Sequence, residues 1–581
     1  MPALRREAAA CFLLALLFGG LFTGGLRSHL AWTMASCLLW AAAWRSQRRP
    51  DLAQLKLWTP WLLWLLACLL AGSQPLKGVY PLARWAGVAA FAAMAASLWE
   101  EPDRKRWLNA LWGGAFVLGA AARWGARHAS ARELGESMTG LIPPYYNYTA
   151  FVVAAAAAAA VAFAAAVARA PEQEGRGGCW RLLPLLAFFC WILYLQRARA
   201  ASLGLLAACA LALGRRFGWR RLALAGAAAG LLGLTLFASL PEGRRDFLLK
   251  KDKSQVAKRP EIWAAALAVA RDHPVLGEGP GGFAAGFRRH NFPSRYRVTN
   301  YQFSTPYAHS EPLQAAAETG FVGLLLLLGV VALGVRVPLR GLTPEREAAL
   351  AALVCMSVQL LVDNMLQVPA LAMLYFSTLA VLRPQGSGMH APVPAPSWTA
   401  ACAIGLALSL TAWLPESLYT ASLAGSGEPR RAVALFPAEP EAREALGRFY
   451  LTSRPPRLDL AKAAFGEAAR LSPKNALYPV FIAELLRSEG RGREMGALVE
   501  RALLLEPNFL QARLLRAELL AHAGRKADAL GELAEVQRRR GELEGARVYV
   551  PDRSLYTGFD LTVCAFDAAR FASVKALASR R

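Results

Sequence analysis

An imidazole next to a carboxylate stands out among the residues that could do chemistry. His309 directly precedes Ser310, Glu311 and Pro312, a pattern that begins a helix. The partial positive charge of a helix N-terminus disfavours imidazolium, so we predict a neutral His309 that can accept a proton. The alternative is a histidine that only hydrogen-bonds at the helix start. Glu311 is the second candidate base, although a carboxylate there can simply complement the helix dipole.

Two arginines close together form a second candidate site. Arg197 and Arg199 fall in a short turn between two apolar runs. A guanidinium stays charged and can donate to two phosphate oxygens at once, so the turn indicates phosphate binding. The alternative is a pair of interfacial arginines whose side chains extend to water.

The segment 259–320, set between two long apolar runs, must position His309. Its apolar residues repeat at helical spacing from Glu261 to Ala270, which predicts a short helix. Gly277–Gly282 then interrupts the pattern. No Gly-Lys-Ser/Thr follows, as it would in a phosphate-binding loop. We therefore expect these glycines to bend the backbone, with direct phosphate contact as the alternative.

Three further polar residues are candidate supporting groups. Asn147 precedes an alanine-rich apolar run, where it lies at the mouth of a span or caps a helix. Asp363 ends another apolar run, a place where charge is costly and where it could hold an arginine. Gln314 belongs to the same short motif as His309.

The composition places most of the chain in a membrane. Of 581 residues, 55% are hydrophobic, and the mean hydropathy is +0.29. We predict an all-α, polytopic membrane bundle of about twelve to thirteen spans, each near the length that a helix needs to cross a bilayer. The predicted spans are 8–26, 30–44, 57–72, 79–99, 107–122, 145–168, 181–196, 200–213, 219–240, 320–336, 347–367, 369–382 and 398–415.

Arginine and lysine gather in alternate short loops, which predicts that those loops face the cytoplasm. The long loop 241–319 and everything after the last span then face outward. The net charge is +25, and the outer loop itself is rich in cations. An outward loop at a membrane is the wrong place for nucleic acid, so an anionic lipid head group is the expected partner. A solvated, lipid-facing surface is the alternative. No Cys/His spacing suits a metal, and we expect none.

The C-terminal region differs from the rest and contains a repeat. Leu471-Ser472-Pro473 recurs thirty-four residues later as Leu505-Glu506-Pro507, and Glu484 corresponds to Glu518. This period is typical of tetratricopeptide repeats, which form an α-solenoid with a concave binding surface. We predict a membrane domain over 1–418, a repeat domain over 425–545 and a tail over 546–581.

The central motifs resemble those of the O-antigen ligase and polymerase family. They are Arg259-Pro-Glu-Ile-Trp263, His273-Pro-Val-Leu-Gly-Glu-Gly-Pro-Gly-Gly-Phe283 and His309-Ser-Glu-Pro-Leu-Gln314 with Glu318-Thr-Gly320. The resemblance covers roughly 145–382 and implies a bundle like that of GT-C glycosyltransferases. It also implies transfer of a glycan from undecaprenyl diphosphate to a glycan, lipid A core or protein acceptor. The transfer would invert the sugar, need no metal or other cofactor, and occur on the periplasmic side of the bacterial inner membrane.

The resemblance also implies roles for single residues. Arg199 and Arg259 would bind the diphosphate, and His309 would lie at the reacting centre. The family usually has Ser-Arg where this chain has Ala198-Arg199, which leaves Arg197 as a rival. It usually has His-Asn where this chain has His309-Ser310, which puts in doubt an acceptor contact made by the asparagine.

A non-enzymatic scaffold or polysaccharide exporter that recruits envelope proteins through its repeats is the alternative function. Transporters usually place ionisable residues in the middle of their spans and have paired broken helices. Here the polar groups gather at the predicted outer surface, which favours the enzyme.

Overall fold

The computed structural model forms two compact units, each of which combines distant stretches of sequence. The first unit comprises 1–259, 272–280 and 307–414, and the second comprises 260–271, 281–306 and 415–581. The loop 241–319 is therefore divided between them, which the sequence-based domain boundaries did not anticipate. The structure describes residues 2–22, 26, 28–45, 49–128, 152, 154–160, 162, 182–196, 199–218, 220, 239, 241, 259–293, 300–301, 304–335, 342–383, 391–423, 428–549, 562–563 and 565–579.

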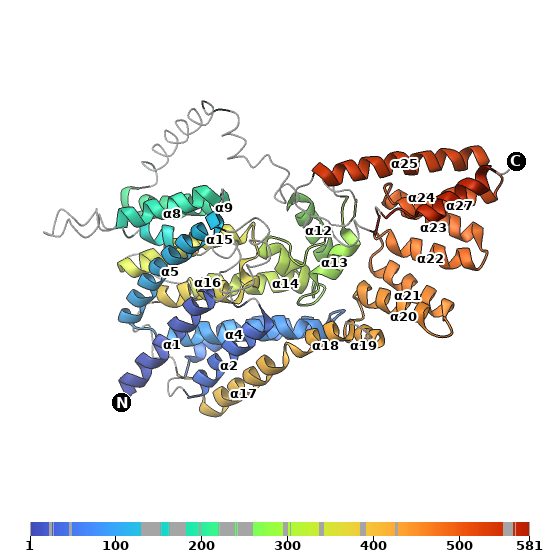
Figure 1. Ribbon diagram of the computed structural model, residues 1–581. Coiled ribbons are helices and arrows are strands. Elements are labelled where there is room, and N and C mark those ends of the chain that lie inside the picture. Colours follow the sequence, from blue (N-terminus) through green and yellow to red (C-terminus); the bar gives the residue numbers. More distant parts are fainter. Residues whose placement is uncertain are drawn as a thin grey trace. The chain divides into compact units, whose positions relative to one another are not determined.

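The described residues of the first unit fold into helices around a central one, α16 (Figure 1). Because α16 is apolar on all sides, it is buried along nearly its whole length, as expected for such a helix. It packs against α1, α4 and α15, and Ser377 on α16 accepts a hydrogen bond from the indole N–H of Trp107 at 3.0 Å. The helices are α1 (Pro2–Phe22), α2 (His29–Arg45), α3 (Leu52–Ala71), α4 (Pro75–Leu98), α5 (Glu101–His128), α8 (Leu182–Gln196), α9 (Arg199–Phe217), α14 (Glu311–Gly334), α15 (Pro344–Leu360), η5 (Met365–Gln367), α16 (Pro369–Leu382) and α17 (Ala395–Thr411).

Four stretches of helix among the described residues are long and apolar enough to cross a membrane. They are Leu52–Ala71, Pro75–Leu98, Glu311–Gly334 and Ala395–Leu423. Shorter apolar helices cover Leu182–Tyr194, Ala200–Arg215 and Pro369–Leu382. The all-helical membrane fold is therefore confirmed, whereas the number of twelve to thirteen spans stays a prediction.

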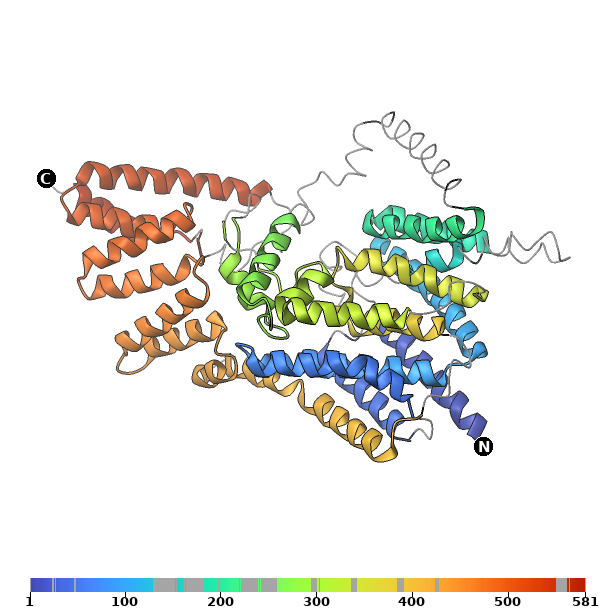
Figure 2. The ribbon, with the colours of Figure 1, turned by 180° about the vertical axis from the view of Figure 1, so that it is seen from behind.

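The second unit consists largely of helices that follow one another in space as they do in sequence. Each of α20 to α25 packs against the next along the chain, and Figures 1 and 2 show this row from opposite sides. The helices are α12 (Arg259–Asp272), α13 (Phe283–His290), α18 (Leu414–Leu423), α19 (Pro429–Leu435), α20 (Pro440–Thr452), α21 (Leu458–Leu471), α22 (Leu477–Ser488), α23 (Gly492–Leu505), α24 (Leu510–His522), α25 (Lys526–Tyr549) and α27 (Ala568–Ser579).

The helix boundaries agree with the repeat seen in the sequence. Both ends of α21 recur thirty-four residues later as the ends of α23, from Leu458 to Gly492 and from Leu471 to Leu505. Glu484 and Glu518 occupy equivalent positions in the repeat, and both contact Arg570 of α27. One guanidinium nitrogen of Arg570 lies 3.1 Å from a carboxylate oxygen of each. The assignment of these helices to the tetratricopeptide class stays a prediction.

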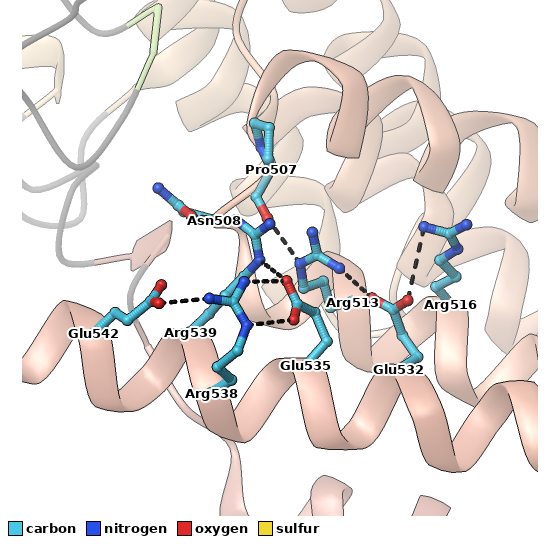
Figure 3. Close-up of polar contacts among 9 residues, drawn as sticks. All are labelled: Pro507, Asn508, Arg513, Arg516, Glu532, Glu535, Arg538, Arg539 and Glu542. Atoms are coloured by element: carbon cyan, nitrogen blue, oxygen red, sulfur yellow. Dashed lines mark hydrogen bonds and ion pairs between the residues drawn. The ribbon is translucent and has the colours of Figure 1, made fainter.

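Charged side chains join the last described helices of this row. Figure 3 shows Arg513 of α24 between the carbonyl oxygen of Pro507, at 2.7 Å, and the carboxylate of Glu532 on α25. Arg516 approaches the other oxygen of Glu532 at 3.8 Å. The two helices are thus fixed by paired charges as well as by their apolar contacts.

Candidate functional site around His309

The helix that carries the site begins where the sequence predicts. Helix α14 starts at Glu311, with Ser310 in the N-cap position and a proline in its first turn. The side chain of Ser310 makes no capping hydrogen bond. His309 has a φ of 51°, the left-handed region that non-glycine residues rarely adopt. Such conformations persist where the surroundings impose them, and they cluster at functional sites.

The surroundings of His309 favour its neutral form. Burial lowers the pKa of His309 below 6.5, and the positive charge of Arg259 lowers it further. The charge of Asp363 and a hydrogen bond with the side chain of Asn364 act in the opposite direction. Burial and the charge of Arg259 thus favour the predicted neutral imidazole. A proton-accepting imidazole needs this form.

Asp363 lies near the histidine. One of its oxygens accepts a hydrogen bond from the backbone N–H of Asn364 at 2.9 Å. Within the described residues it forms no ion pair with an arginine, which the sequence had suggested, and its charge acts on His309 instead. Asp363 and Asn364 follow α15, so a second helix end contributes to the site.

Gln314 positions the backbone just ahead of His309. Its side-chain oxygen accepts a hydrogen bond from the N–H of Ala308 at 2.6 Å, and its nitrogen donates to Glu318 at 2.8 Å. Gln314 is 1% exposed, so both bonds are shielded from water. This residue therefore supports the loop that leads to His309.

Both carboxylate oxygens of Glu311 accept hydrogen bonds from the short helix η5. The carboxylate accepts hydrogen bonds from the backbone N–H of Leu366, at 2.6 Å, and from the side-chain nitrogen of Gln367, at 3.1 Å. Arg84 of α4 donates to both the backbone oxygen and the side-chain oxygen of Gln367, at 2.9 and 2.8 Å. These bonds favour a positioning role for Glu311 over that of a base. Arg84 was not among the predicted site residues, although a lone arginine within an apolar run was a usable signal.

The glycine cluster forms a bent segment, residues 273–280, that we call the glycine hairpin. Gly277 and Gly279 have φ values of 65° and 98°, which confirms that these glycines bend the backbone. The N–H of Glu278 donates to Ala317 at 2.9 Å, and the N–H of Gly279 donates to Glu318 at 3.0 Å. The N–H of Phe321 in turn donates to Pro274 at 2.8 Å.

The hairpin docks where α14 is broken. Gly320 has a φ of 70° and interrupts the helix. A Cβ atom at Gly320 would lie 1.9 Å from the oxygen of Val275, and one at Gly277 would lie 2.3 Å from the carbonyl carbon of Glu318. The close backbone approach thus requires glycine on both sides, and it fixes the first turns of α14, which follow His309.

Of the three candidate arginines, only Arg259 has a side chain among the described residues. Arg259 begins α12, and the predicted stripe of Ile262, Ala265, Ala266 and Val269 is buried, which confirms the short helix. Asn147 and Arg197 lie outside the described residues. Helix α9 begins at Arg199, whose side chain is likewise outside the description.

Together, the fold and the site define a helical membrane protein whose candidate reacting group lies at the start of one broken helix. Residues 184–328 match the sequence model of a family described as O-antigen ligase. The matched stretch contains Arg259 and His309, and it supports an O-antigen ligase-type membrane enzyme, in agreement with the resemblance of the motifs. A search of curated proteins gave no match.

Proposed function

We propose that this protein is a glycosyltransferase that moves a glycan from undecaprenyl diphosphate to a glycan, lipid or protein acceptor on the periplasmic side of the inner membrane. The observation that carries the proposal is the half-buried His309 at the start of α14, whose pKa Arg259 helps to lower, within a stretch that matches the O-antigen ligase family. A guanidinium next to a neutral imidazole pairs an anion-binding group with a base.

In the proposed reaction His309 accepts the proton of the acceptor hydroxyl as its oxygen attacks the anomeric carbon. The bond from that carbon to the diphosphate oxygen breaks, and the electron pair leaves with the diphosphate. Attack opposite to the leaving group inverts the sugar. Arg259, with Arg199 or Arg197, stabilises the charge that develops on the leaving diphosphate, and this needs no metal.

The test replaces His309 by asparagine in the full chain. Asparagine tolerates positive φ but cannot act as a base at neutral pH, so the backbone is kept while the reaction is removed. We expect transfer from a purified lipid-linked glycan in liposomes to fall by about 10²- to 10⁴-fold. His522→Ala, which removes an exposed histidine of α24, is the control and should retain full transfer. Unchanged transfer by His309→Asn would exclude the imidazole as the base.

A second pair of variants tests the anion-binding role of Arg259. Arg259→Ala should raise the KM for the donor, and Arg259→Lys should raise it less, because a lysine keeps the charge but cannot form paired hydrogen bonds. Donor titrations with both variants provide the measurement. Equal KM values for all three proteins would remove Arg259 from the donor site.

A further inference from the structure

The geometry points to the C-terminal helices as the support of the outer loop, with Glu439 and Glu506 as positioning residues for the segment that leads to His309. We call residues 281–306 the clamped segment. The inference rests on the proposed function, because it explains how a loop that serves the reaction is held. It gives the predicted repeats a role within the enzyme itself, in addition to any external partner.

The first attachment is a shielded ion pair. Arg288 of α13 contacts Glu439 at 2.7 Å and Glu441 at 3.4 Å. The side chains of Arg288 and Glu439 are only 15% and 6% exposed. A pair so shielded from water depends on both partners, because a lone buried charge is costly. This pair ties α13 to the residues that lead into α20.

The second attachment uses the backbone of the loop. The carboxylate of Glu506, which is 1% exposed, accepts hydrogen bonds from the backbone N–H groups of Asn300 and Tyr301, the latter at 3.2 Å. The side-chain nitrogen of Asn300 donates to the carbonyl oxygen of Leu505 at 3.1 Å. Glu506 follows α23 directly, in the motif whose equivalent has Ser472 at this position. The repeat therefore departs from its own pattern at the residue that holds the loop.

Lys474 contacts two residues of the clamped segment, Asn291 and Tyr301. Lys474 donates to the carbonyl oxygen of Asn291, and its ammonium lies 5.6 Å from the ring centre of Tyr301. A cation at that distance from an aromatic ring is attracted to it. Three separate charged residues, Glu439, Lys474 and Glu506, thus hold the clamped segment at four described positions.

The attachment limits the path of the chain to His309. Tyr301 is fixed through Glu506, Ala308 is fixed through Gln314, and only six residues separate the two along the chain. Misplacing a reacting group by about 1 Å can cost about 10²-fold in rate. Release of Tyr301 should therefore loosen the loop and slow transfer, although no clamping residue needs to touch the substrate.

The experiment compares the full chain with Glu439→Ala/Glu506→Ala in hydrogen exchange and in glycan transfer. We expect amides in 284–293 and 300–309 to exchange about tenfold or more faster, while those in α22 and α24 keep their rates. Transfer should fall about tenfold or more. Glu467→Ala/Glu494→Ala is the matched control, because these carboxylates lie on α21 and α23 in exposed pairs and should affect neither measurement.

A pair of charge-reversal variants distinguishes loss of the ion pair between Arg288 and Glu439 from a general loss of structure. Arg288→Glu and Glu439→Arg should each speed exchange in α13, and the two together should restore it. Failure of the pair to restore protection, unchanged loop exchange in the double alanine variant, or a loosened loop with full transfer would each overturn the inference. Because exchange needs no substrate, an unaltered chain that transfers nothing would reject the proposed function while the exchange data still decide the attachment.

Discussion

Two segments of the loop 241–319, the glycine hairpin and the clamped segment, are held by different means. The glycine hairpin is held by backbone hydrogen bonds to α14, at points where even a methyl group would overlap with backbone atoms. The clamped segment is held by charged side chains that reach it from the C-terminal helices. The first kind of contact allows almost no replacement. The second kind can be weakened, exchanged or restored by changing charges.

The difference shows how one loop can combine a segment that tolerates almost no substitution with a segment whose contacts can be changed by substitution. Backbone contacts depend on conformation, so they fail completely when a side chain prevents the approach. Charge pairs depend on the identity of two side chains, so a compensating change can rescue them. Variants of the glycine hairpin and of the clamped segment should therefore differ in whether a second substitution can restore the lost contact.

The largest effect is expected for Gly320→Ala. Its Cβ would lie 1.9 Å from the oxygen of Val275, and the φ of 70° already disfavours a side chain. We expect a loss of about 3 kcal/mol or more in the free energy of unfolding, seen as low yield and early thermal unfolding in detergent. Gly329→Ala, in the same helix with no atom within 4 Å of its Cβ, is the control and should behave as the unaltered chain. Equal behaviour of the two variants would contradict the proposed tight backbone docking.

A smaller effect is expected for Asp363→Asn, which alters the electrostatics at His309 and leaves the contacts of both segments intact. The charge of Asp363 raises the pKa of His309, so its removal lets the pKa fall further. Transfer requires neutral His309, so the acid limb of kcat/KM should move to lower pH, by about half to one unit. Asp459→Asn, at an exposed residue of α21, should leave the profile unchanged. A shift to higher pH would contradict the assigned base.

An effect on stability smaller than that of Gly320→Ala is expected for Arg570→Ala, which tests charge contacts away from the loop. Burial raises the pKa of Glu484, but hydrogen bonds and charge from Arg570 outweigh it, so the net pKa is lowered from 4.5. The contact therefore stabilises the fold above the unfolded pKa and is lost as pH falls. We expect a loss of about 1–2 kcal/mol near pH 7 by thermal unfolding, which shrinks below about pH 4.5.

The matched control for that variant is Arg525→Ala. Arg525 pairs with Asp528 at 2.7 Å, but both side chains are more than half exposed. Exposed pairs contribute little, so this variant should unfold as the unaltered chain does at every pH. A difference between the two arginine variants that does not change with pH would contradict the role of Glu484.

Local patterns in the sequence predicted the elements well. The apolar stripe of α12, the start of α14 at Glu311 and the bend at the glycines each depend on residues close together in the chain. Each follows from periodicity, a proline in the first turn of a helix or glycine geometry. The neutral state of His309 was also predicted, although burial and Arg259 contribute to it in ways the helix start could not reveal.

Contacts between distant residues could not be predicted. The bonds from Glu311 to Leu366, from Arg84 to Gln367 and from Glu506 to Tyr301 join residues dozens to hundreds of positions apart. Spacing along the chain carries no information about such pairs, since tertiary packing alone brings them together. Glu506 was seen only as part of a repeated motif, and its departure from Ser472 was the one local sign of a special role.

The broken helix α14 has a consequence for biosynthesis. A break in an apolar helix leaves peptide groups without partners inside the helix, and here the hairpin supplies partners to Ala317, Glu318 and Phe321. Those partners precede α14 in the chain, so they leave the ribosome first. The nascent protein thus already carries the complement of the break when the helix itself is made.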